Sequence, residues 1–134
     1  MPEQVSAEFL NGLTDQIIGA AIDIHRVFGP GLNESVYAQG LHQQLEKRGL
    51  TVQSQKLVPL LATEGRAPRG FRIDLLVEGS VVVEVKAVEK LLPLHEAQLR
   101  TYLRLSGCQV GLLLNFNVPR LKDGIKRVVN KFPD

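Results

Sequence analysis

The stretch from Phe71 to Ala87, FRIDLLVEGSVVVEVKA, decides which fold this chain can adopt. Apolar residues alternate with polar ones on both sides of Gly79, a pattern that predicts two short antiparallel strands joined by a tight turn. The alternation predicts one apolar face for the first strand, made of Phe71, Ile73, Leu75 and Val77. It predicts a second such face for the next strand, made of Val81, Val83, Val85 and Ala87.

The length of the turn decides where the two acidic residues of the hairpin lie. A three-residue loop over residues 78–80 places Val77 opposite Val81, and Asp74 then faces Glu84 across the ladder. Facing carboxylates repel each other, so this register calls for a nearby positive charge, which a divalent metal ion would supply. A two-residue turn would instead put the two acids on opposite faces.

The same register permits a structural explanation without any metal. Arg72 and Lys86 also face each other, so the four charged side chains form a diagonal ion-pair quartet on a solvated face in this second interpretation. The hairpin residues alone do not separate the two interpretations.

Composition places the chain among globular proteins and excludes several classes of site. With 134 residues, 44% of them hydrophobic and 22% charged, we expect one domain over residues 1–134, with residues 1–12 a flexible N-terminus. A formal net charge of +2 permits a nucleic-acid partner without arguing for one. The single cysteine, Cys108, excludes an intramolecular disulfide and a cysteine-cluster metal site. The sequence contains neither a signal-peptide pattern nor an apolar run of membrane-spanning length, so we expect a cytoplasmic protein without a membrane partner.

Periodicity supplies the other elements of an α/β protein. Helical spacing of apolar residues predicts helices at Thr14–Phe28, Asn33–Arg48 and Leu94–Leu105. Further strands are predicted at Thr51–Ala62, with Pro59 indicating an edge or a bulge, and at Val110–Asn115. The C-terminal segment is compatible with a helix or an edge strand, of which we favour the strand. Its basic residues suit either a solvated face or contact with phosphates.

Several polar residues on the helices have both a structural and a functional interpretation. Glu34 heads the apolar stripe of the second helix, either as a buried acid or as a first-turn partner of the helix dipole. Gln98 and Tyr102 are four residues apart, so they share a face as a polar pair at a helix–sheet boundary or as the lining of a site. His25 has no second ligand-type residue one turn away, which favours a packing or surface role.

Taken in chain order, these motifs resemble those of the PD-(D/E)XK nuclease superfamily, and within it the small proteins called GxxExxY proteins. The naming motif stands as Gly31-Leu32-Asn33-Glu34-Ser35-Val36-Tyr37. The superfamily signature stands as Asp74 followed by Glu84-Val85-Lys86, and the helix motif of RecB-type nucleases as Gln98-Leu99-Arg100-Thr101-Tyr102. The usual proline before the first Asp is absent, since Ile73 precedes Asp74. The cysteine set of the iron–sulphur branch is absent too, so no cluster is implied.

The resemblance implies a fold, a cofactor and a set of roles. The implied fold is a restriction-endonuclease-like αβββαβ core, in which helices flank a mixed central sheet. The implied cofactor is a Mg or Mn ion, with the metal ligands Glu34, Asp74, Glu84 and the Val85 carbonyl. Lys86 is implied to orient the attacking water, and Gln98 and Tyr102 to line the catalytic cleft. The candidates for contact with nucleic-acid phosphates are Arg72, Arg100 and Arg104.

Two functions from different classes remain open at this point. The first is a metal-dependent nuclease that acts on DNA, and the second is a non-catalytic nucleic-acid-binding or assembly module that keeps the nuclease fold. The intact set of Asp74, Glu84 and Lys86 favours the first. A chain this short leaves little surface for gripping a duplex, so we also expect a homodimer or a protein partner, which light scattering would detect.

Overall fold

The computed structural model of the chain describes residues 5–61 and 69–133, which form one mixed sheet with helices on both faces. The helices are α1 (Ala7–Phe28), α2 (Glu34–Lys47) and α3 (Pro93–Ser106), with a short 3-10 helix η1 at Leu121–Gly124. The strands are β1 (Val52–Leu61), β2 (Arg69–Val77), β3 (Val81–Lys86), β4 (Val110–Asn115) and β5 (Ile125–Val129). The sheet order is β1-β2-β3-β4-β5, and β3 and β4 are parallel, whereas the other neighbours are antiparallel.

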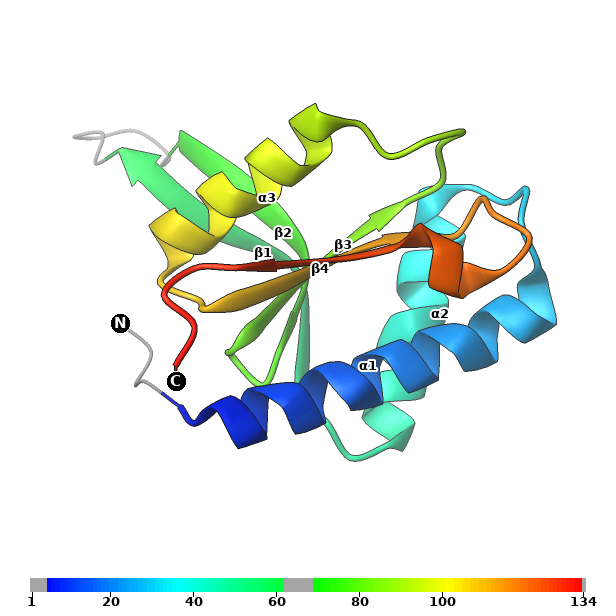
Figure 1. Cartoon of the computed structure of the whole chain (residues 1–134), viewed down its shortest axis with the longest axis horizontal. Helices are drawn as coiled ribbons and strands as arrows, with labels where there is room; N and C mark the ends of the chain where they lie inside the picture. The colour runs from blue at the N-terminus through cyan, green and yellow to red at the C-terminus, as the bar shows by residue number, and fades with distance from the viewer. Residues whose placement is uncertain (1–4, 62–68, 134) are drawn as a thin grey trace.

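Two apolar clusters sandwich the central strands. Helices α1 and α2 cover one face of the sheet, and α3 crosses the other (Figure 1). Strands β3 and β4 are buried on both faces, as expected for a parallel pair joined by a crossover helix. Glu84 of β3 is therefore buried, whereas Asp74, on the neighbouring strand β2, is partly exposed.

The helix on the N-terminal side begins earlier than the sequence indicated. Ser6 caps α1 by accepting a hydrogen bond from the Phe9 N–H at 3.1 Å, so residues 7–12, expected to be flexible, form helical turns. Residues 1–4 lie outside the described part of the chain. The prediction for α2 is confirmed, since Asn33 caps it by accepting a hydrogen bond from the Val36 N–H at 3.1 Å.

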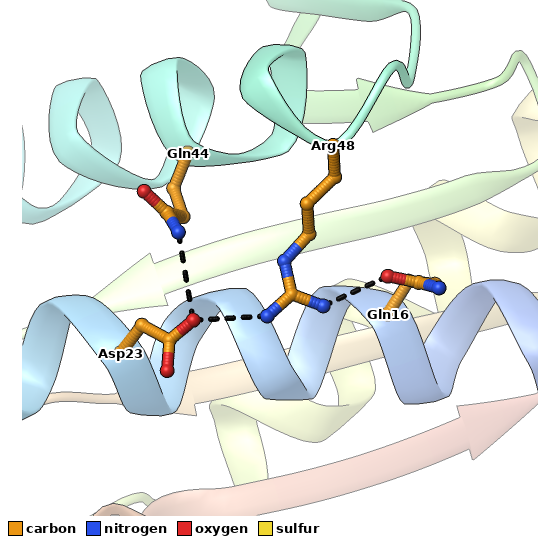
Figure 2. Close-up of polar contacts among 4 residues, drawn as sticks. All are labelled: Gln16, Asp23, Gln44 and Arg48. Carbon is orange, nitrogen blue, oxygen red and sulfur yellow. Dashed lines mark hydrogen bonds and ion pairs between the residues drawn. The ribbon is translucent and has the colours of Figure 1, made fainter.

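Polar side chains join α1 to α2. Arg48, at the end of α2, lies across α1, where its Nη2 is 2.9 Å from Asp23 Oδ2 and its Nη1 donates to Gln16 Oε1 at 2.8 Å (Figure 2). Gly19 leaves room for this guanidinium, because an added Cβ would meet it at 3.2 Å. Gln44 also donates to Asp23, at 3.5 Å. One polar face of α2 is therefore fixed to α1.

The prediction that Phe71, Ile73, Leu75 and Val77 share one face of the first hairpin strand is wrong for its first two residues. Leu75 and Val77 pack with α1 and α2 as expected, but Ile73 and Phe71 pack on the opposite face with α3. The cause lies in the neighbouring strand, where Gln55 has a positive φ of 54° and the β1–β2 pairing is interrupted opposite Asp74. Ile73 and Leu75, two residues apart on β2, therefore point to opposite faces of the sheet, and a strictly alternating sequence pattern cannot indicate such a change.

The remaining strand predictions are confirmed. Pro59 lies on the edge strand β1 next to a register shift, β4 has the predicted bounds, and the C-terminal segment forms the strand β5. Residues 62–68, which follow β1 in the chain and include the last residue of the predicted strand Thr51–Ala62, lie outside the described residues. Among the described residues, no helix has both the length and the apolar character needed to cross a bilayer.

The loop between α1 and α2 depends on the buried hydroxyl of Tyr37. That hydroxyl donates to the Gly29 carbonyl at 2.5 Å and accepts from the Leu32 N–H at 3.2 Å. The ring stacks on Phe116, with centroids 4.6 Å apart. Gly31, in the same loop, has φ 101°, which residues with a side chain rarely adopt. The glycine and the tyrosine of the Gly31–Tyr37 motif thus shape the entry to α2.

We expect Tyr37→Phe to lower the free energy of unfolding by about 1–2 kcal/mol, because it leaves two backbone groups of the loop without their partner. Urea denaturation of the metal-free protein measures this loss. Tyr102→Phe, at the other tyrosine of the chain, is the matched control and should change stability by less than about 0.5 kcal/mol. Equal losses in the two variants would contradict the role given to the Tyr37 hydroxyl.

Candidate active site

Asp74 and Glu84 meet where β2 and β3 separate. The ladder between these strands runs from Val77↔Val81 to Leu75↔Val83, so the predicted three-residue turn is confirmed. At the next position each carboxylate takes the place of a strand carbonyl. Glu84 Oε2 accepts from the Asp74 N–H at 2.9 Å, and Asp74 Oδ2 accepts from the Val85 N–H at 2.8 Å. The two acids therefore face each other, held by backbone hydrogen bonds.

Burial raises the pKa of both carboxyl groups of this pair. Glu84 is 5% exposed, and burial, reinforced by the neighbouring Asp74 carboxylate, raises its pKa from 4.5 to about 8. Burial also raises the pKa of Asp74, although the Val85 N–H and the Lys86 ammonium oppose that rise. A cation bound between the two carboxylates would relieve both effects.

The ion-pair quartet is not formed. Among the described residues, no ion pair within 4.0 Å joins Asp74 or Glu84 to a lysine or arginine. Arg72 turns to β1, where its Nη1 donates to the Gln55 carbonyl at 3.3 Å. Lys86 is half-buried and lies near enough to lower the pKa of both acids without pairing with either. The quartet interpretation is therefore wrong, and within the described part of the chain no direct ion-pair partner neutralises the acid pair.

Helix α3 brings Tyr102 and Gln98 to the same place. Tyr102 stacks on Phe71 of β2 with centroids 4.0 Å apart and ring planes 5° from parallel. Burial raises the pKa of Tyr102, and the carboxylates of Glu84 and Asp74 add to the rise, whereas the Gln98 side chain opposes it. The predicted four-spaced pair therefore lies beside the carboxylates.

Two of the predicted arginines lie apart from the carboxylate pair, whereas Glu34 lies at its border. Arg100 Nη2 is 3.8 Å from Glu96 Oε1 on the same helix, and that oxygen is also 3.9 Å from Lys126 Nζ of β5. Arg104 is one turn further along the same exposed side of α3. Glu34 is exposed rather than buried, and its Oε2 accepts from the Ala87 N–H, just beyond β3, at 3.3 Å. Glu34 thus borders the site from the first turn of α2.

The structure adds two residues that the sequence analysis missed. Gln55, at the interruption of β1, lies beside Asp74 and lowers the pKa of its carboxyl. Asn115 is 2% exposed and fixes the chain after β3, because its amide donates to the Val88 carbonyl at 2.9 Å and accepts from the Val88 N–H at 3.0 Å. A polar residue that ends a wholly apolar strand was the signal for Asn115. No sequence signal marked Gln55.

The acid pair fits a small, hard divalent ion. Magnesium takes oxygen ligands and keeps several of its waters, so one or two carboxylates are a usual protein contribution. In the described part of the chain, no three His, Cys, Asp or Glu side chains gather as a ligand group. Asp74 and Glu84 are the side chains that could hold such an ion, and Glu34 borders them. An all-oxygen pair of this kind suits magnesium or manganese better than zinc.

Metal-free protein should lose stability as the pH rises between about 4.5 and 8. The folded state holds the Glu84 proton with a pKa of about 8, whereas the unfolded chain releases it near 4.5, so ionisation favours unfolding across this interval. Glu84→Gln removes that dependence, so the variant should gain stability relative to the wild type as the pH rises. Urea titrations at pH 5, 6, 7 and 8 in chelator measure the difference. Glu89→Gln, at an exposed position, is the control, and a parallel pH dependence for the wild type and Glu84→Gln would refute this account.

Comparison with known proteins agrees with this geometry. The family model described as the PD-(D/E)XK nuclease superfamily matches residues 11–128. No curated protein and no solved structure gives a match to the chain. The matched segment contains the five-stranded mixed sheet, the helices on both faces and the acid pair, and this architecture is the restriction-endonuclease-like α/β fold that the motifs implied. The chain belongs to the PD-(D/E)XK nuclease superfamily.

Proposed function

We propose that this chain is a divalent-metal-dependent nuclease that hydrolyses phosphodiester bonds, with DNA as its substrate. The observation that carries the proposal is the buried pair of Asp74 and Glu84, whose pKa values are raised and which forms no ion pair with a lysine or arginine among the described residues, so that it leaves a place for a cation. Structural carboxylates in a core are normally paired with a positive side chain. A pair kept without one indicates a ligand-binding role.

The chain's own atoms provide a compact set of oxygen ligands. Asp74 and Glu84 would each offer one carboxylate oxygen, since the other oxygen is held by a backbone N–H, and the Val85 carbonyl would complete the set. A divalent ion bound there supplies a Lewis acid for the phosphate and lowers the pKa of a bound water. The backbone hydrogen bonds fix the direction of both carboxylates before the ion arrives.

Lys86 and Tyr102 are placed to act on the substrate around that ion. Lys86 follows Glu84 by two residues on β3, so its ammonium points to the same side of the sheet and can hold the attacking water by a hydrogen bond. Its charge also offsets the negative charge that builds on the phosphate during attack. Tyr102 closes the α3 side, where its hydroxyl can donate to a phosphate oxygen.

Contacts with the rest of the nucleic acid would come from basic residues around the site. Arg72, on β2, is the nearest candidate, and Arg100 and Arg104 lie further out on α3. The exposed Lys126 of β5, 3.9 Å from Glu96 of α3, extends this basic surface, whereas Arg127 turns to the other face of the sheet and donates to Asn11 of α1. Binding through such residues displaces counterions, so affinity should fall steeply as salt rises.

Purified protein should cleave DNA with manganese or magnesium and should not cleave it with chelator. Glu84→Ala should abolish cleavage, because it removes a ligand and an anchor of the Asp74 backbone. Lys86→Met should lower the rate by about a hundred-fold or more while metal binding survives, because Lys86 acts on the water rather than as a ligand. Gel assays on single- and double-stranded DNA and RNA measure these rates. Equal residual cleavage by the wild type and Glu84→Ala would identify a contaminant and favour a non-catalytic binding module.

The metal site itself can be tested without activity. Asp74→Asn keeps an acceptor for the Val85 N–H, so at pH 8 and above, where Glu84 is ionised, the metal-free variant should be as stable as the wild type or more stable by about 0.5 kcal/mol, as for the loss of facing like charges. The variant should lose the rise in melting temperature that manganese gives the wild type. Thermal melts of both proteins, each with manganese and with chelator, measure this. A wild type indifferent to manganese would refute the metal site.

A further inference from the structure

A polar groove opens beside the carboxylate pair, on the side away from Tyr102. It lies between α2 and β1, encloses about 520 Å³, and includes Asp74 in its wall. That volume falls within the range of about 300–1,000 Å³ that small-ligand sites occupy. Since Asp74 is shared, anything bound in the groove is adjacent to whatever the acid pair holds.

The lining of the groove suits an uncharged, hydrogen-bonding ligand. Three amide side chains face it, from Gln39 and Gln43 on α2 and from Gln55 on β1. Its carboxylates, Glu46 and Asp74, would repel a phosphate, and no lysine or arginine occurs among the described residues that line it. Primary amides present a donor and an acceptor side by side, which is the pattern that pairs with the edge of a nucleobase.

The two walls of the groove are tied together. His42 Nδ1 hydrogen-bonds Ser54 Oγ across the groove, and His42 Nε2 lies 3.4 Å from Glu46 Oε2 one turn along α2. The opposite polar face of α2 is fixed to α1 through Arg48 and Gln44 (Figure 2). By contrast, the amides of Gln39 and Gln43 form no hydrogen bond with the described residues, so their donors and acceptors face solvent. A groove with fixed walls and unused amides is organised before a ligand binds.

We propose that this groove binds an unpaired nucleobase of the strand that is cut, next to the phosphate at Asp74 and Glu84. The inference rests on the proposed nuclease function and names its substrate class. A base held by Gln39 and Gln43 cannot keep its Watson–Crick partner, because the same edges are engaged and a paired base lies inside the helical stack. The preferred substrate is therefore a single strand or an unpaired segment, and blunt duplex is a poor one.

Binding can be measured without cleavage. In a Glu84→Gln background with chelator, fluorescence anisotropy should show a single-stranded DNA 12-mer binding about ten-fold more tightly than blunt duplex and than a 12-mer of the same length with abasic residues at its central positions. Combining Gln39→Leu with Gln43→Leu should abolish the preference for the base-containing strand. Gln44→Leu is the matched control, since it makes the same change on the same helix but on the face that contacts α1, and it should keep the preference. An RNA 12-mer with the same bases tests whether the sugar also matters.

Equal affinity for the intact and abasic strands, an undiminished preference in the double variant, or no binding to any strand would overturn the groove assignment. Melting temperatures of all variants exclude misfolding as the cause of a loss. Cleavage assays separate this failure from failure of the proposed function. Manganese-dependent cutting that is indifferent to abasic sites and to the two leucines would refute the groove while the nuclease stands. A wild type that neither cuts nor gains stability with manganese would refute both.

Discussion

The whole site depends on two side chains that take over backbone hydrogen bonds at the point where β2 and β3 part. Antiparallel strands that separate leave N–H groups without a carbonyl partner, and buried groups of that kind are costly. Here the carboxylates of Asp74 and Glu84 accept those protons. The end of the ladder and the ligand pair are therefore one feature, because the same oxygens that close the sheet fix the direction of the acids.

The layers around the sheet give this pair its chemical character. Strand β3 is covered by α1 and α2 on one face and by α3 on the other, so Glu84 has little access to water (Figure 1). Low solvation weakens the ionised form and at the same time strengthens any bond to a cation. Lys86 lies two residues further on, at the end of β3, where exposure increases. The core of the protein thus sets the electrostatics, and the end of the strand provides the access.

Much of the arrangement could be predicted from local rules, and the failures have physical causes. The cap at Asn33 and the register that faces Asp74 with Glu84 depend on neighbours in sequence, so short-range patterns contain them. The packing of Ile73 against α3 depends on the backbone of Gln55, a residue of another strand with no turn signature. Tyr102 of α3 lies beside the acids whereas Arg100 lies apart from them, a difference set by tertiary packing that a sequence spacing of four does not specify. The facing of Asp74 and Glu84 could therefore be predicted from local sequence patterns. The residues that surround them depend on contacts between elements that are distant in the sequence.

The parallel pairing of β3 with β4 also bears on how the protein assembles. The β2–β3 hairpin closes over three residues, whereas β4 joins β3 only after a crossover that contains α3 and runs from Lys86 to Val110. Closing a longer loop costs more chain entropy, so local hairpins form faster than parallel pairs. The acids can therefore meet early in folding, in water, while Tyr102 and the apolar cover come with the crossover. The metal binding that we propose for this place would then require the completed fold rather than the hairpin alone, and stopped-flow mixing with manganese during refolding would resolve this as a lag.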